Sequence, residues 1–346
     1  MRHLTITTIG GMKPLVSAAI LLWIAVLAPA AEVLPLPEVY VCPEILEVDG
    51  ELLVHNYSFS FYVYGLKPFR LKAKFGGEGE GPGEFKNLIH LSVRPPEFVI
   101  YTVGKLATFS LDGKLLKEVK VPRGRHLVPA GENYVGYSMG NRDRFITVDV
   151  NLYRADAGQA TSLVRNRHYF QINRPLDLVR FALGRVQRAH YRVTRDRIFV
   201  QGDDDTIHVF DLSGRKRYDI SLNYDKRKVE DADKAEIHDM LNLRFKSDRM
   251  RQLIRENGFF PDRFPAGRFL IDGERIYVPT FQRQGNETRF VVLDLQGTIL
   301  KSIHLPLSYL SAYIPFTFTI HGHRLYRFVE NEDEEHLEIH VHDIPD

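Results

Sequence analysis

Residues 191–222 read YRVTRDRIFVQGDDDTIHVFDLSGRKRYDISL, and this stretch contains the pattern that decides the fold. Apolar and polar side chains alternate in short runs, and each run stops at a turn rich in Asp, Gly or Ser. These turn residues accept the positive φ that tight hairpins require. The stretch therefore predicts a unit of short antiparallel strands joined by hairpins.

The same pattern recurs along the chain. Similar copies are found at 44–75, 98–122 and 268–305, and looser copies fill 127–164 and 316–344. Six units of about 53 residues match the spacing of propeller blades, in which radial packing of four-stranded sheets hides long sheet edges. The last unit offers three strands, and Val33–Val41 is expected to pair as its fourth and close the ring. A pair of β-sandwiches is the alternative, which six similar units fit poorly.

We therefore predict an all-β fold, a six-bladed β-propeller, with residues 31–346 as one domain. The segment 223–265 departs from the strand pattern. Asp231 or Asp233 as a cap, apolar residues at helical spacing and Gly258 as a stop predict a helical insertion at about 226–258, between blades 4 and 5. Such a helix either packs on the rim of the propeller or acts as a lid or partner-docking element.

The first thirty residues have the pattern of a secretory signal. Basic residues precede an apolar run at Leu15–Leu27, and Ala28-Pro29-Ala30 places small residues at −3 and −1. The apolar run is short for a bilayer span, although an uncleaved N-terminal anchor is the alternative. We expect residues 1–30 to be a signal peptide, the mature chain to lack a transmembrane span, and the protein to be periplasmic or secreted.

Charge and cysteine content exclude several classes. The chain has 46 basic and 44 acidic residues, a formal net charge of +2, and removal of Arg2 and Lys13 with the leader brings this to zero. This balance is not that of a generally basic nucleic-acid binder, so no nucleic-acid partner is expected. The single cysteine excludes an intramolecular disulfide framework and a cysteine cluster for zinc.

A glycine-rich segment carries a family resemblance. Residues 75–85, FGGEGEGPGEF, resemble the segment that opens NHL-type repeats and recurs in bacterial six-bladed β-propeller proteins of the TolB-like group. The turns at Phe109–Gly113 and Leu293–Gly297 are similar too, while the third and sixth units depart from the NHL pattern. The resemblance implies residence in the periplasm or outside the cell, and a scaffold role without catalysis.

Strand geometry indicates where binding is expected. In a four-stranded meander, the connection between the second and third strands lies at the same end as the link to the next blade. This end, the long-loop face, therefore carries the longest connections, and varied loops on a rigid scaffold are where binding usually occurs. The candidate binding residues on it are Lys105, Arg142, Asp203, Asp204, Asp205 and Arg283.

Two clusters are candidate metal sites. The carboxylates of Asp203–Asp205 suit Ca²⁺ or a cationic ligand, and a solvated turn is the alternative. In the last strand, His336, Glu338, His340 and His342 alternate with apolar residues, so all four lie on one face. Imidazoles at i and i+2 can chelate Zn²⁺; the alternative is the polar face of a half-exposed outer strand.

The sequence thus predicts an exported, non-catalytic scaffold that binds a protein or small-molecule partner on the long-loop face. The alternative is a lactonase-like metal-dependent hydrolase or lyase, similar to propeller enzymes that hold a metal in the axial channel. Such an enzyme needs Glu, Asn, Asp or His ligands converging from the inner strands of several blades, and the sequence does not single out such a set. Apart from Ca²⁺ or Zn²⁺, no cofactor is indicated.

Overall fold

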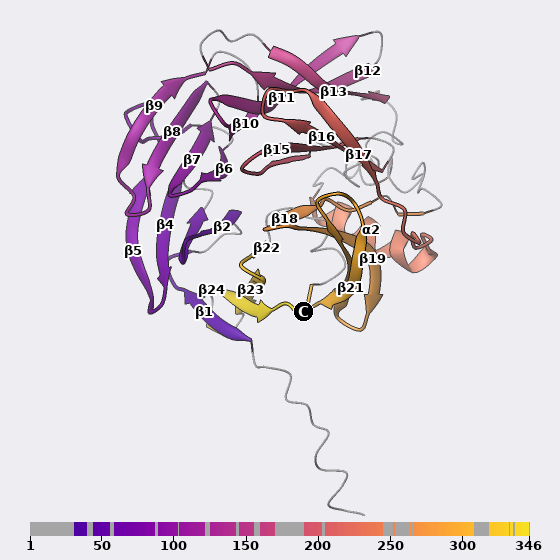
Figure 1. Cartoon of the computed structure of the whole chain (residues 1–346). Coiled ribbons are helices and arrows are strands. Elements are labelled where there is room, and N and C mark those ends of the chain that lie inside the picture. Colours follow the sequence, from indigo (N-terminus) through magenta and orange to yellow (C-terminus); the bar gives the residue numbers. More distant parts are fainter. Residues whose placement is uncertain are drawn as a thin grey trace, which may run out of the picture.

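The computed structural model describes residues 31–39, 44–55, 59–86, 89–102, 104–121, 125–142, 145–155, 160–169, 190–202, 205–244, 252, 263–264, 266–307, 318–331, 333–334 and 336–345. Within these ranges, 24 strands form six four-stranded antiparallel sheets. The sheets stand around a central axis like the blades of a propeller (Figure 1). The predicted all-β, six-bladed propeller is confirmed.

The first three blades follow one another along the chain. Blade 1 comprises β2 (Glu44–Val48), β3 (Glu51–His55), β4 (Ser60–Leu66) and β5 (Phe69–Gly76). Blade 2 comprises β6 (Ile89–Arg94), β7 (Glu97–Thr102), β8 (Lys105–Ser110) and β9 (Leu115–Lys120). Blade 3 comprises β10 (Arg125–Ala130), β11 (Asn133–Arg142), β12 (Phe145–Tyr153) and β13 (Ala160–Tyr169).

The last three blades complete the ring. Blade 4 comprises β14 (Tyr191–Val193), β15 (Arg197–Gln201), β16 (Thr206–Asp211) and β17 (Lys216–Ser221). Blade 5 comprises β18 (Leu270–Asp272), β19 (Arg275–Gln284), β20 (Glu287–Asp294) and β21 (Ile299–Leu305). Blade 6 comprises β22 (Phe318–His321), β23 (Arg324–Asn331), β24 (His336–Asp343) and, from the other end of the chain, β1 (Glu32–Leu36).

Blade 6 closes the ring as the sequence predicts. β1 pairs with β24 in antiparallel register, with Leu34 opposite Ile339, and becomes the outermost strand of the sheet. The closing strand covers Glu32–Leu36, a shorter stretch than the predicted Val33–Val41. Because β1 lies outside it, β24 is the third strand of blade 6 and not its outer edge.

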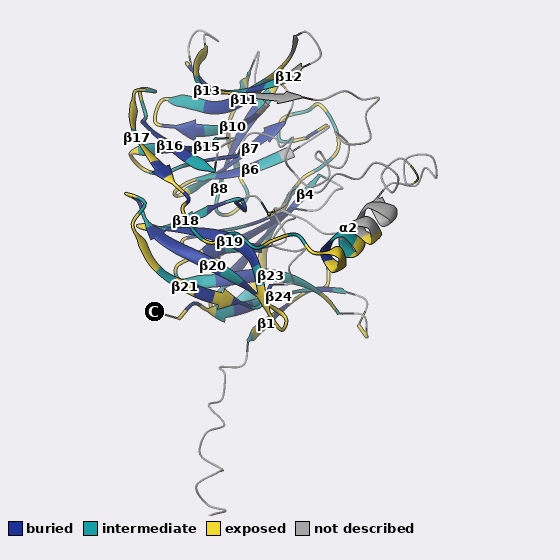
Figure 2. Cartoon of the chain, turned by 90° about the vertical axis from the view of Figure 1, so that its right-hand side faces the viewer, coloured by how far each residue is buried: buried dark blue, intermediate teal, exposed yellow. Residues whose placement is uncertain are grey.

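Apolar side chains are buried between neighbouring blades. An apolar cluster joins each adjacent pair; between blades 4 and 5, for example, Phe199 and Val209 pack with Ile276 and Val278. In blades 1 and 2, the second and third strands lie between two sheets and are buried on both faces, whereas the fourth strands β5 and β9 are largely exposed. Figure 2 shows exposed residues on the fourth strands β17 and β21 as well. This sandwiching is why the middle strands are rich in aromatic and branched residues.

A recurring turn joins the third and fourth strands of blades 2, 4 and 5. Its glycines, Gly113, Gly214 and Gly297, adopt φ of +79°, +85° and +94°, and each donates its N–H to the carbonyl three residues earlier. A Cβ on Gly297 would lie 2.6 Å from Cγ2 of Ile220 in the preceding blade. Glycine is therefore required here both for the backbone conformation and for the close approach of the two blades.

The predicted helical insertion between blades 4 and 5 is not supported. A short helix, α2 (Asp231–Arg244), follows β17, but the expected insertion at about 226–258 does not have that extent. Positions 226–230 are not helical, because α2 begins where the Glu230 N–H donates to Asp233 Oδ2 at 2.8 Å, a capping interaction. Positions 245–251 and 253–262 lie outside the described residues. In Figure 2, α2 lies on the side away from the C-terminus.

Candidate functional site

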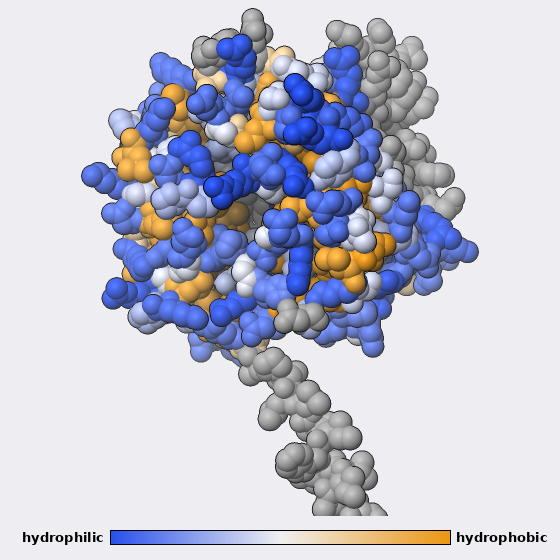
Figure 3. Space-filling view, viewed as in Figure 1, coloured by the Kyte–Doolittle hydropathy of each residue, from blue (hydrophilic) through white to orange (hydrophobic). Residues whose placement is uncertain are grey.

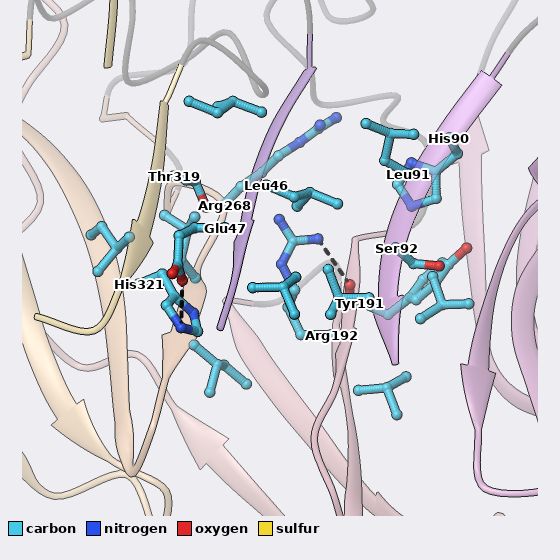
Figure 4. Close-up of a pocket in the computed structure, with 18 of the residues that line it drawn as sticks. Leu46, Glu47, His90, Leu91, Ser92, Tyr191, Arg192, Arg268, Thr319 and His321 are labelled. Carbon is cyan, nitrogen blue, oxygen red and sulfur yellow. Dashed lines mark hydrogen bonds and ion pairs between the residues drawn. The ribbon is translucent and has the colours of Figure 1, made fainter. Parts of the chain in front are cut away.

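The first strands of all six blades line a cavity on the propeller axis. Its volume is about 370 Å³, within the range of sites that hold small molecules. The side chains that line it come from β2, β6, β10, β14, β18 and β22 and from residues next to these strands. Figure 4 shows that polar groups from several blades enter this one space. We call it the axial cavity.

Two arginines from neighbouring blades reach into the axial cavity. Arg192 lies on β14 and Arg268 lies two residues before β18, and Figure 4 shows both side chains extending into the space. Arg192 Nη1 donates to the Tyr191 carbonyl at 3.3 Å. Between their strands lies His190, whose Nε2 is 2.7 Å from the Phe269 carbonyl. Burial, followed by the charges of Arg192 and Arg268, lowers the pKa of His190 well below its ordinary value.

A carboxylate and an imidazole form an ion pair at another part of the wall. Glu47 Oε2 of blade 1 lies 2.6 Å from His321 Nε2 of blade 6, and the Gly50 N–H donates to Glu47 Oε1 at 2.8 Å. The hydrogen bond that His321 donates to Glu47 raises the pKa of His321 above its ordinary value, against the opposing effect of partial burial. Asp272 of blade 5 accepts the N–H groups of Gly322 and His323 at 3.0 Å each, which fixes the turn beyond His321.

Two further histidines lie along the cavity wall. The rings of His90 on β6 and His126 on β10 are 4.8 Å apart, and the His126 ring stacks on Tyr137 at 5.3 Å. The Tyr191 hydroxyl donates to the His126 carbonyl. Among the described side chains, no group of three or more His, Cys, Asp or Glu is arranged to hold a metal ion. The geometry here is that of a packed wall.

The axial cavity opens on the face opposite the long loops. We call this end, which carries the short turns after the first and third strands of each blade, the tight-turn face. The half-exposed His321 and the exposed Asp49 and Pro95 belong to both the cavity lining and these turns. Figure 3 looks onto this face, which is largely hydrophilic and hollowed near its centre.

Lys105, a predicted binding residue, holds the glycine-rich segment in place. Its Nζ donates to the carbonyls of Glu84 at 2.6 Å and Gly81 at 3.2 Å, and pairs with Glu118 at 3.1 Å. The buried Phe85 ring lies beneath the same ammonium group, 5.3 Å from it. These contacts use Lys105 inside the fold, and they give the glycine-rich segment a structural role in blade 2.

The acidic turn of blade 4 is described in part. Asp203 and Asp204 lie outside the described residues. Asp205 has φ of +60°, forms an ion pair with Lys226 and accepts the Ala266 N–H at 3.0 Å. Asp205 therefore ties together the two ends of the long connection between β17 and β18.

The remaining two predicted binding residues both lie at long-loop turns. Arg142 ends β11, and its side chain is outside the described part of the structure. Arg283 lies near the end of β19, and its Nη1 is 3.5 Å from Glu236 Oε2 of α2. This ion pair brings α2 beside the hairpin of β19 and β20.

A buried ion pair anchors α2 to the propeller. The Asp233 side chain is 0% exposed, and its Oδ1 lies 2.7 Å from Nη2 of Arg227. Arg227 in turn lies 5.4 Å from the centre of the Phe264 ring and donates to the Phe281 carbonyl at 3.5 Å. The start of α2 is therefore fixed against blade 5 by charge, hydrogen bonds and an aromatic ring.

Beside this anchor is a basic groove on the long-loop face. Five basic side chains, one acid and one amide line it: Asp225, Lys226, Arg227, Lys228, Arg263, Gln282 and Arg283. Several of the cations have acidic partners, as in the Arg263–Asp225 pair at 3.2 Å, which is largely exposed. Exposed pairs of this kind contribute little stability, so their cations can exchange partners at small cost.

The predicted zinc strip lies on the face of β24 that turns toward blade 5. Leu325, opposite His342, belongs to the apolar cluster between blades 5 and 6. Glu338 accepts hydrogen bonds from Asn331 at 2.7 Å and from His340 at 2.9 Å, and these hold its pKa below the ordinary value. His336 Nε2 lies 3.7 Å from the same carboxylate. The strip is thus a half-buried hydrogen-bonded network on an inner strand.

The axial residues were not identified from the sequence. Glu47, His90, His126, Arg192 and His321 each occupy the first strand of a repeat unit. Superposing the six units would have placed all first strands around one axis. Polar residues in those strands are the signal that could have revealed the cavity.

Fold and site together define the class: a six-bladed β-propeller with a polar axial cavity and a basic groove on its long-loop face. No family model matches the chain, and no curated protein matches it either. Two solved structures are similar in arrangement. The crystal structure of BamB from Moraxella catarrhalis has a TM-score of 0.32 and 10% identity, covering 86% of this chain and 71% of that one. The computationally designed Ika8 protein has a TM-score of 0.41 and 9% identity, covering 91% of this chain and 100% of that one.

A search of the described helices for membrane spans finds none that is long and apolar enough to cross a bilayer.

Proposed function

We propose that the protein is an exported, non-catalytic binding scaffold that holds a protein partner on its long-loop face. The observation that carries the proposal is the basic groove beside α2, because it is a built surface: the Arg227–Asp233 pair fixes its helix and Asp205 fixes its connection. Its exposed cations, Lys228, Arg263 and Arg283, favour a partner with an acidic surface.

The resemblance of residues 75–85 to NHL-type segments supports placing the chain in the TolB-like group of propellers. The signal pattern of residues 1–30 supports export to the periplasm or the medium, with residues 31–346 as one propeller domain. The alternative, a metal-dependent hydrolase or lyase, has no specific support among the described residues, where no metal-ligating group of three is formed.

Site-specific photo-crosslinking in the native host tests which face binds the partner. A photo-reactive amino acid is placed at Asp239 of α2 and Gln284 of the β19–β20 hairpin, both exposed on the long-loop face. Matched positions on the tight-turn face are the exposed Asp112 and Glu274. We expect one defined adduct from the long-loop positions, decreasing as salt is raised. Equal adducts from both faces, or adducts from the tight-turn face alone, would refute the proposal.

A further inference from the structure

The axial cavity has a charge pattern that the proposed function does not use. Its lining contains two guanidinium groups, Arg192 and Arg268, and two carboxylates, Glu47 and Asp49. Glu47 is engaged with the imidazole of His321 at 2.6 Å, and Asp49 is exposed at the rim. The two guanidinium groups therefore bring positive charge into the cavity.

A buried imidazole lies beside the two guanidinium groups. His190 is buried in the wall, and both Arg192 and Arg268 contribute to lowering its pKa. His190 therefore stays neutral at physiological pH and adds no charge of its own. The two guanidinium groups come from adjacent blades and enter the same cavity (Figure 4).

Apolar side chains also line the cavity. Leu46, Val193 and Ile271 are partly exposed, come from three different blades and line the space that the arginines enter. A free inorganic anion would leave these side chains without a ligand contact. A molecule with an anionic group and an apolar chain would satisfy both parts of the cavity.

We propose that the axial cavity binds a small organic acid, with its carboxylate between Arg192 and Arg268 and its apolar chain against Leu46, Val193 and Ile271. The planar guanidinium fork matches the two oxygens of a carboxylate, which makes arginine the residue suited to this contact. The site is separate from the long-loop groove, and the proposal does not depend on a protein partner.

Isothermal titration of the purified protein with octanoate tests the proposal, with octanamide as the neutral probe of the same chain length. We expect saturable binding of one octanoate per chain, and binding of octanamide at least about tenfold weaker, because charged hydrogen bonds are worth more than neutral ones. Octanoate affinity should also fall as salt is raised. Equal affinity for the two probes, or no saturable binding of octanoate, would overturn the proposal without any mutation.

Variants then assign the two arginines. Arg192→Gln and Arg268→Gln should each weaken octanoate binding by about tenfold or more, while leaving octanamide binding unchanged. Arg70→Gln on the exposed outer strand β5 is the matched control and should bind as the wild type does. Thermal melting establishes folding first, and Lys substitutions, which keep the charge, replace any Gln variant that fails to fold. Wild-type affinity in both cavity variants would refute the assignment.

Discussion

Replacement of Gly297 by Ala should destabilise the propeller through one defined contact. An Ala at φ of +94° carries a backbone cost of about 1–2 kcal/mol for an L-residue in this region. Its Cβ would also lie 2.6 Å from Cγ2, 3.1 Å from Cγ1 and 3.2 Å from Cβ of the buried, branched Ile220. Overpacking of this kind costs about 1–3 kcal/mol. We expect a decrease in the free energy of unfolding of about 2–5 kcal/mol.

Urea unfolding followed by far-ultraviolet circular dichroism measures this decrease. Gly104→Ala is the matched control, because Gly104 has φ of +84° with nothing within 4 Å of a Cβ, and it should show the backbone cost alone. Gly113→Ala, with an aromatic ring atom 2.7 Å away, should resemble Gly297→Ala. Gly214→Ala, whose nearest neighbour is Leu152 Cδ2 at 3.1 Å, should lie between. Equal midpoints for Gly297→Ala and Gly104→Ala, with equal denaturant slopes, would show that contact between blades contributes nothing.

Three further predictions concern charged groups. Asp233→Ala removes the buried carboxylate that pairs with Arg227 and should increase the rate of hydrogen exchange throughout α2 by tenfold or more. Asp231→Ala is the control and should have a small effect, because the Asp231 side chain is 94% exposed. The raised pKa of His321 means that its ion pair with Glu47 stabilises the fold fully below about pH 6.5, and that this stabilisation is lost as pH rises through the folded-state pKa. The free energy of unfolding should therefore fall by under about 1 kcal/mol toward pH 9, and Glu47→Gln should remove this pH dependence. Plasma mass spectrometry of the wild type and His340→Ala tests whether the candidate zinc strip binds metal. Because Glu338 already accepts hydrogen bonds from Asn331 and His340, we expect equal zinc content in the two proteins. Loss of one zinc per chain in His340→Ala would establish a metal site.

The sequence was sufficient for the blades because their determinants are local. Alternating apolar strands and turns such as Asp211–Gly214 recur at similar spacing, and each unit needs only its own residues to form a hairpin meander. Closure by β1 was also predictable, since one unit lacked a strand and a strand-like segment remained at the other end. The start of the helix was misjudged, because the prediction included positions 226–230, whereas the helix begins at Asp231, where Asp233 accepts the Glu230 N–H.

The axial cavity could not be derived from local pattern. Glu47 and His321 contact each other across 274 positions of sequence, and Arg192 and Arg268 approach one cavity from separate blades. Only the closed ring brings these side chains together. The predicted binding residues were chosen by their position in turns of the long-loop face. Turn position does not indicate side-chain contacts, so it did not reveal that Lys105 and Asp205 have partners inside the fold.

The two arginines that we propose to bind the carboxylate are separate from the apolar clusters that stabilise the propeller. Stability comes from these clusters between neighbouring blades, built mainly from second and third strands, together with glycine turns that let those strands approach. Arg192 and Arg268 are partly exposed on or beside first strands and belong to none of the described clusters. Changing them alters the charge of the axial cavity while leaving the blade contacts in place. Loss of octanoate binding with unchanged thermal stability would therefore locate the effect at the cavity itself, because the interfaces that hold the ring together remain intact.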